Sequence, residues 1–196
     1  MRFAEKIIAL RDCRTAAMRS PAASDAGAML EYKKQMAAET EFVGPYPEEI
    51  TQTVEDIAKY LSDCAESRNT VQISVFVEGH IVGNASIAPI TDRIKLRHRS
   101  GFGIAVLKEF WGLGIGWQLT EASISSASAM GYEMIDLSMM EGNTAAGCLY
   151  EKAGFKEYGR VEHGFKMKSG RYGTEVLMVK YLQNGMQKST GNPVLF

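Results

Sequence analysis

Three glycines at alternate positions separate a predicted strand from a predicted helix. The apolar run Phe102–Leu107 is typical of a buried strand, Gly112, Gly114 and Gly116 follow it, and a helical pattern continues to about Met130. Glycine within a helical turn costs up to about 1 kcal/mol relative to alanine, so three together need a reason. Without Cβ atoms, backbone N–H groups can point into one concavity at the positive end of the helix dipole. The spacing therefore predicts a diphosphate-binding loop.

Other interpretations of this loop fit less well. A P-loop needs Gly-x4-Gly-Lys-Ser/Thr, and the sequence contains no such string. A dinucleotide fold would use Asp136 for the ribose, but Trp117 stands where its third glycine belongs, and Lys108–Trp111 separates the strand from the glycines. Too little chain follows to build the second half of a doubly wound sheet. A glycine-rich connector with no ligand remains the alternative.

Composition narrows the class of protein. The chain has 196 residues, a net charge of −1 and 45% hydrophobic residues, which fits one globular domain with a sizeable core. The lack of a basic excess argues against a nucleic-acid partner, and the apolar runs are too short for a membrane-spanning helix. Met1–Arg14 carries too many charges for the centre of a signal peptide. We expect a cytoplasmic protein without a metal, whose three widely spaced cysteines are small buried residues: Cys13, Cys64 and Cys148.

Two strings resemble motifs of a known family. Val106–Gly116 is similar to motif A of the GNAT N-acetyltransferases, whose consensus is Arg/Gln-x-x-Gly-x-Gly/Ala. Asn143–Phe155 resembles motif B, which closes on Leu-Tyr-Glu-Lys-x-Gly-Phe. A predicted helix and strand lie between the two strings, as in the family. Trp111 departs from motif A, which usually has Arg or Gln at that position.

The resemblance implies an α/β (α+β) fold. Its central mixed, mostly antiparallel sheet has about seven strands, splays in the middle and is flanked by about four helices. A single acetyltransferase domain is expected over residues 15–182, with an N-terminal extension at 1–14 and a loosely ordered tail at 183–196.

Local patterns place the elements along the chain. We expect Ser24 or Asp25 to cap the first helix and Thr53 the second. Basic residues alternate with apolar ones from Arg93 to Arg99, which indicates the solvated face of a hairpin. The predicted helices are Ser24–Ala38, Thr53–Ser67, the one after the glycine loop, and Asn143–Ala153; the predicted strands include Val71–Val77, Ile81–Ile90, Phe102–Leu107, Met134–Met140, Phe155–Glu162 and Thr174–Leu182.

The resemblance also implies how the chain would hold acetyl-CoA as cosubstrate. The end of the strand before the loop, Val106 and Leu107, would offer backbone groups to the pantetheine arm, with the thioester in the gap of the splayed sheet. Asn143 would cap its helix or bond a pantetheine amide, and the small Ala146 would leave room beside the arm. The pyrophosphate amides would come from Gly112, Leu113, Gly114, Gly116 and Trp117.

Tyr150 is the candidate for assisting the leaving group. It lies on the same helical face as Asn143, at i+7 spacing. Acetyl transfer expels a thiolate whose reference pKa is about 8.5, and a tyrosine near 10 is matched closely enough to bond or protonate it. The alternative is a core aromatic whose hydroxyl is satisfied within the protein.

An attacking amine must be neutral, so a general base is expected. Glu141 ends the strand beside the gap, and His98 is the second candidate because histidine is the residue type best suited to exchange a proton at neutral pH. Glu39 and Glu41 could bind a cationic acceptor. Each of the four has the alternative of a solvated surface group.

The function predicted from the sequence is acetyl transfer from acetyl-CoA to a primary amine. The acceptor is a small molecule or an amine of a peptide or protein, with the small molecule favoured slightly. Trp117 and Ile124 lie opposite the apolar face of their helix and suit a second packing surface or the contact of a homodimer. The alternative function is a CoA-binding sensor or partner module with no turnover.

Overall fold

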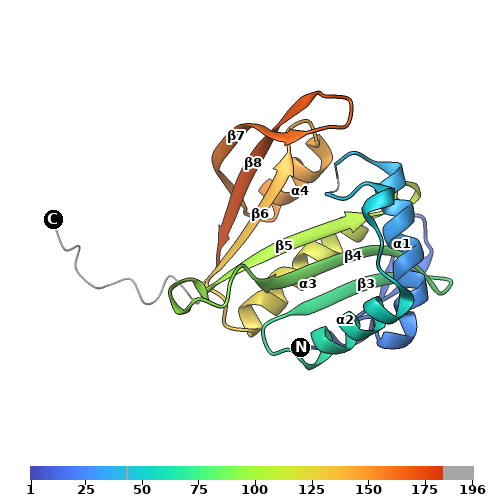
Figure 1. The fold of residues 1–196 in the computed structure, drawn as a ribbon. Coiled ribbons are helices and arrows are strands. Elements are labelled where there is room, and N and C mark those ends of the chain that lie inside the picture. Colours follow the sequence, from blue (N-terminus) through green and yellow to red (C-terminus); the bar gives the residue numbers. More distant parts are fainter. Residues whose placement is uncertain (43, 183–196) are drawn as a thin grey trace. The chain divides into compact units, whose positions relative to one another are not determined.

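The computed structural model describes residues 1–42 and 44–182, so the predicted tail lies outside the described residues. The chain forms two compact units. The first comprises Met1–Ala88 and Phe102–Ser126, and the second Pro89–Gly101 and the described residues from Ala127 onward. The described strands form one eight-stranded sheet in the order β1-β2-β3-β4-β5-β6-β8-β7, one strand more than about seven (Figure 1). The mixed, mostly antiparallel α+β architecture with four α-helices is confirmed.

Antiparallel strands form the sheet of the first unit. β1 lies inside the segment predicted as an N-terminal extension, and it pairs with β2 over four residues. Every residue of β3 is buried, and β3 pairs with β4 along its whole length. The strands are β1 (Lys6–Ala9), β2 (Thr15–Arg19), β3 (Val71–Val77), β4 (His80–Pro89) and β5 (Arg99–Val106), of which the part from Phe102 belongs to this unit.

Helix α3 (Ile115–Ala129) packs closely on β4 in the first unit, and it passes behind the strands in the view of Figure 1. A Cβ atom at Gly83 would lie 3.1 Å from Ile115 Cγ2 and 3.2 Å from Leu119 Cδ1. Ile115 and Leu119 are fully buried, as the predicted apolar face requires. The missing side chain at Gly83 therefore sets how closely the start of α3 approaches the sheet.

The two N-terminal helices are confirmed, and both begin after a predicted N-cap residue. In α2 (Val54–Glu66), Thr53 Oγ1 accepts from Asp56 N–H at 3.1 Å while Asp56 accepts from Thr53 N–H at 2.9 Å. In α1 (Ala26–Glu39), the Asp25 side chain makes no capping hydrogen bond to the helix. Asp25 is nevertheless the N-cap residue of α1, one of the two residues predicted, and a different partner engages its carboxylate.

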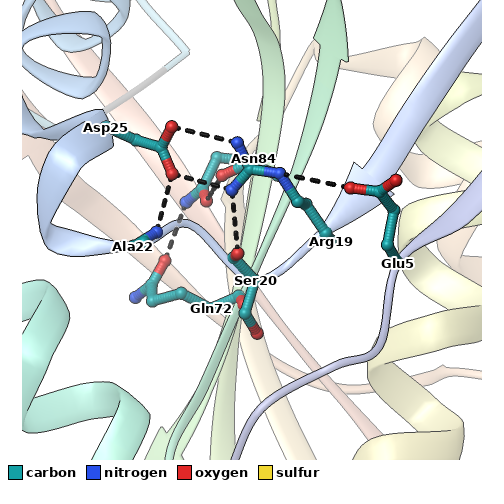
Figure 2. A network of polar contacts seen from close by, with 8 residues as sticks. Glu5, Arg19, Ser20, Ala22, Asp25, Gln72 and Asn84 are labelled. Carbon is teal, nitrogen blue, oxygen red and sulfur yellow. Dashed lines mark hydrogen bonds and ion pairs between the residues drawn. The ribbon is translucent and has the colours of Figure 1, made fainter.

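That partner is Arg19, at the centre of a polar network (Figure 2). Its guanidinium donates to both carboxylate oxygens of Asp25, at 2.7 and 3.0 Å, and lies 3.9 Å above the ring of Phe76. The pKa of Asp25 is lowered, chiefly by this pairing with Arg19. Asp25 also accepts from Ala22 N–H at 2.7 Å. The network fixes the chain between β2 and α1.

The second unit is built on β6 (Met134–Met140). Its first three residues pair in parallel with Arg99–Gly101 of β5, whereas all seven pair antiparallel with β8 (Tyr172–Tyr181). β7 (Lys156–Lys166) pairs with β8 on the other side. Helix α4 (Thr144–Lys152) follows β6.

The segment before β5 differs from the predicted hairpin face. Ile94–Leu96 forms a 3₁₀ turn, and Ile94 is 77% exposed, so the alternation of basic and apolar residues is not a strand alternation. Arg99 donates to Asp136 of β6 at 3.0 Å through its Nε. Asp136 is therefore occupied by an ion pair, in keeping with the rejection of the dinucleotide fold.

Burial also corrects one prediction about the cysteines. Cys64 is buried, as expected, but Cys13 and Cys148 are exposed free thiols.

Across the described residues, none of the helices combines the length and the apolar character that crossing a membrane requires.

Candidate functional site

The glycine loop of the first unit adopts a conformation that side chains rarely allow. Gly112 has φ +76° and Gly114 has φ +91°, both left-handed. Gly114 C=O accepts from Gln118 N–H at 3.2 Å, so the hydrogen bonds of α3 begin there. These φ values explain why glycine occupies positions 112 and 114.

The loop leaves its backbone open to a ligand. A Cβ atom at Gly112 would meet nothing within 4 Å, and one at Gly114 would meet only the Arg11 side chain, at 3.9 Å. The first four N–H groups of any α-helix have no partner inside the helix. Backbone donors, the helix dipole and a surface without side chains together fit a diphosphate. The residues that would contribute are those predicted: Gly112, Leu113, Gly114, Gly116 and Trp117.

Trp111, the residue that departs from motif A, has a structural role in the turn before the glycine loop. Its indole Nε1 donates to Val106 C=O at 2.7 Å, which closes the turn between β5 and the glycine loop. Leu107 N–H donates to Val82 C=O at 2.9 Å, and Leu107 C=O accepts from Phe110 N–H at 2.9 Å. Both backbone groups of Leu107 therefore have partners inside the protein. Consecutive N–H groups of a strand point in opposite directions, so the Val106 N–H points away from β4.

Glu39, the last residue of α1, bonds to the same turn. Its Oε2 accepts from Lys108 N–H at 2.7 Å, and its Oε1 accepts from Gln35 Nε2 at 2.8 Å. With both oxygens engaged, Glu39 positions the chain that leads into the glycine loop. The predicted role of Glu39 and Glu41 in binding a cationic acceptor stays a prediction, and Glu41 is exposed.

Tyr150 lies in the second unit, on α4, with 7% of its surface exposed. Its ring meets Phe155 edge-on, with the centroids 5.9 Å apart. Burial raises the pKa of Tyr150 to about 12. A tyrosine this weakly acidic remains protonated throughout the neutral range, so it suits hydrogen-bond donation to a thiolate better than complete proton transfer.

The start of α4 confirms the predicted cap. Asn143 Oδ1 accepts from Ala146 N–H at 3.3 Å, while the predicted contact of Asn143 with a cofactor stays a prediction. A Cβ atom at Gly147 would lie 3.2 Å from Met139 Cε. A side chain at position 147 would therefore require Met139 of β6 to move, so glycine suits the packing of α4 against this strand.

The two candidate bases also lie in the second unit. Glu141 is about half exposed and accepts from Arg160 Nη1 at 2.6 Å. The pKa of Arg160 is raised, chiefly by Glu157 and also by Glu141. His98 is half-buried, and its backbone C=O accepts from the N–H groups of Glu133 and Met134. Both remain candidates for the base, and Glu141 must leave or share Arg160 to act.

Sequence reasoning missed one residue at the glycine loop. Arg11, in the turn between β1 and β2, donates from its backbone N–H to Leu113 C=O at 3.3 Å. Its Nη1 donates to Gly112 C=O at 3.2 Å. Because 101 positions separate Arg11 from Gly112, no local pattern could have revealed this contact.

Comparison with known proteins agrees with this geometry. The family model "Acetyltransferase (GNAT) family" matches residues 35–155, which include the glycine loop, Asn143 and Tyr150. This chain belongs to the GNAT acetyltransferase family, and membership implies an acyltransferase. No curated protein matches the sequence significantly.

Solved structures carry the same fold. A GNAT-family acetyltransferase from Streptococcus pneumoniae has 28% identity and a TM-score of 0.82, over 85% of this chain and 99% of that one. Ribosomal-protein-alanine N-acetyltransferase from Brucella melitensis has 24% identity and a TM-score of 0.74, over 84% and 99%. A phosphinothricin acetyltransferase from Sinorhizobium meliloti, solved in complex with acetyl-CoA, has 18% identity and a TM-score of 0.76, over 91% and 92%.

Proposed function

We propose that this protein is an acetyl-CoA-dependent N-acetyltransferase that moves an acetyl group to a primary amine by direct attack on the thioester. The observation that carries the proposal is the glycine loop, whose left-handed Gly112 and Gly114 run into α3 with an open backbone. An acetyl-CoA complex among proteins of the same fold supports the choice of cosubstrate.

The residues of the second unit fit the remaining chemistry. As the amine adds to the carbonyl and the C–S bond breaks, charge develops on sulfur, where a protonated Tyr150 can donate a hydrogen bond. The amine must lose a proton. That step costs roughly 4–5 kcal/mol at pH 7 for a lysine-like amine and about 1–2 kcal/mol for an α-amine. We assign this proton to Glu141 or His98, directly or through water.

We favour a small-molecule amine as acceptor and the cytoplasm as compartment. The exposed thiols of Cys13 and Cys148 support a reducing environment. The structural relatives carry names of both kinds, one for a ribosomal-protein alanine and one for phosphinothricin. At their identities they support the fold and not a choice of acceptor, so the acceptor must be found by experiment.

The test is a thiol-release screen with acetyl-CoA over polyamines, amino acids, aminoglycosides and peptides, run beside calorimetry with CoA. Thiol release above the hydrolysis rate, with an acetylated acceptor found by mass spectrometry, supports the proposal. CoA binding with no release over the whole panel would favour the sensor alternative instead. No CoA binding would remove both.

A further inference from the structure

The turn between β1 and β2 reaches the glycine loop and holds it at two points. The backbone of Arg11 bonds Leu113 C=O, and its guanidinium bonds Gly112 C=O. The same guanidinium lies nearest to where a Cβ of Gly114 would be, with Nε at 3.9 Å. These groups all belong to the first unit. A cation thus stands beside the open backbone that fits a diphosphate.

The loop itself supplies no cation. From Trp111 to Thr120 the sequence has no Lys or Arg, and the position where motif A usually has Arg or Gln holds Trp111. The Trp111 indole N–H is used on Val106 C=O. Without a further group, the diphosphate would be held by backbone amides and the helix dipole alone.

The Arg11 guanidinium has a positive charge and N–H donors that are available to a ligand. Its acidic neighbour Asp12 pairs with Arg14 at 2.7 Å, and that pairing is the chief reason why the pKa of Asp12 is lowered. Among the described residues, the Arg11 guanidinium makes one hydrogen bond, and a guanidinium has five N–H donors. The bond to Gly112 C=O also restricts the side chain before a ligand arrives.

We propose that Arg11 binds the diphosphate of CoA, as the cation that motif A lacks in this chain. The proposal rests on the proposed function, because it needs CoA at this loop. The planar guanidinium is suited to bidentate bonding of phosphate oxygens. The β1–β2 turn, predicted as part of an extension outside the domain, is by this inference part of the cofactor site.

The test compares ligands with and without the diphosphate. Calorimetry measures CoA, dephospho-CoA and pantetheine on wild type, Arg11→Gln, Arg11→Lys and the control Arg68→Gln, which removes an exposed arginine of the same unit. Arg11→Gln removes the charge and keeps a polar side chain. We expect its Kd to rise about tenfold for CoA and dephospho-CoA and less than twofold for pantetheine. Arg11→Lys should fall in between, and Arg68→Gln should match wild type.

The salt dependence of the CoA Kd distinguishes an Arg11 that contacts the ligand from an Arg11 that only holds the loop in shape. If Arg11 pairs with phosphate, the rise of the CoA Kd with salt should be shallower in Arg11→Gln than in wild type. An unchanged salt dependence, or equal losses for CoA and pantetheine, overturns the proposal. CoA affinity unchanged in Arg11→Gln refutes the Arg11 contact and leaves the proposed function standing. Failure of the wild type to bind CoA refutes both.

Discussion

Tyr150→Phe tests whether the buried hydroxyl acts by proton transfer or by hydrogen bonding. With a pKa of about 12, Tyr150 is a weaker acid than a thiol near 8.5 by about 3.5 units, so full transfer to the thiolate would be uphill by about 5 kcal/mol. A hydrogen bond to a charged group contributes about 1.5–3 kcal/mol. We therefore expect acetyl transfer to slow roughly 10- to 150-fold, mostly below the 10²–10⁴-fold that is typical of general acid catalysis.

The assay is single-turnover acetyl transfer at saturating acceptor, because product release can mask a chemical step in kcat. Affinity for acetyl-CoA should stay within a few-fold of wild type, since the substitution removes one oxygen and keeps the ring against Phe155. Tyr132→Phe is the control, because Tyr132 is a second buried tyrosine of the same unit, with 3% exposure. A Tyr150→Phe rate equal to wild type would show that Tyr150 is a packed aromatic and that another group or water stabilises the thiolate.

Three further predictions concern the loop and the fold. Gly114→Val should raise the Kd for acetyl-CoA at least tenfold by calorimetry, because φ +91° strains a side chain that would also block the open backbone; unchanged affinity in a folded variant contradicts the loop assignment. Gly83→Val should lower the free energy of unfolding by about 1–3 kcal/mol in denaturant titrations, since Ile115 lies 3.1 Å from its Cβ position; a neutral effect would mean that α3 shifts freely. Stability should fall as pH rises above about 10, because the unfolded chain then ionises a tyrosine that stays neutral in the folded protein until about 12; Tyr150→Phe should remove about 2 kcal/mol of this loss at pH 12, and parallel curves for variant and wild type would argue against the raised pKa.

Much of the fold could be predicted because local signals agree with the tertiary structure. Val71–Val77 and Met134–Met140 are strands with the predicted bounds, and Thr53 caps α2 through the predicted box. Local signals were incomplete where a second side chain competes for the same group. Asp25 is the predicted N-cap residue of α1, yet Arg19, six positions earlier, takes both of its carboxylate oxygens.

The part of the site that could be predicted is the part whose backbone conformation requires a particular residue type. Gly112 and Gly114 are left-handed, a conformation that strains other residues, so the sequence shows glycine there. The roles of Arg11 and Glu39 were not predictable, because their partners Gly112 and Lys108 lie far along the chain and neither pairing has a periodic signature. The elevated pKa of Tyr150 likewise depends on burial that the motif does not specify.

Trp111, which bonds to Val106, also makes the glycine loop observable by the protein's intrinsic tryptophan fluorescence. The chain has two tryptophans, Trp111 and Trp117, and they flank the glycine loop on either side. Indole emission responds to hydrogen bonding and to nearby charge, and Trp111 is 48% exposed. Tryptophan fluorescence of the unlabelled wild-type protein should therefore report events at this loop with no contribution from tryptophan elsewhere. Stopped-flow recording of that emission would follow the arrival and departure of a nucleotide ligand in real time.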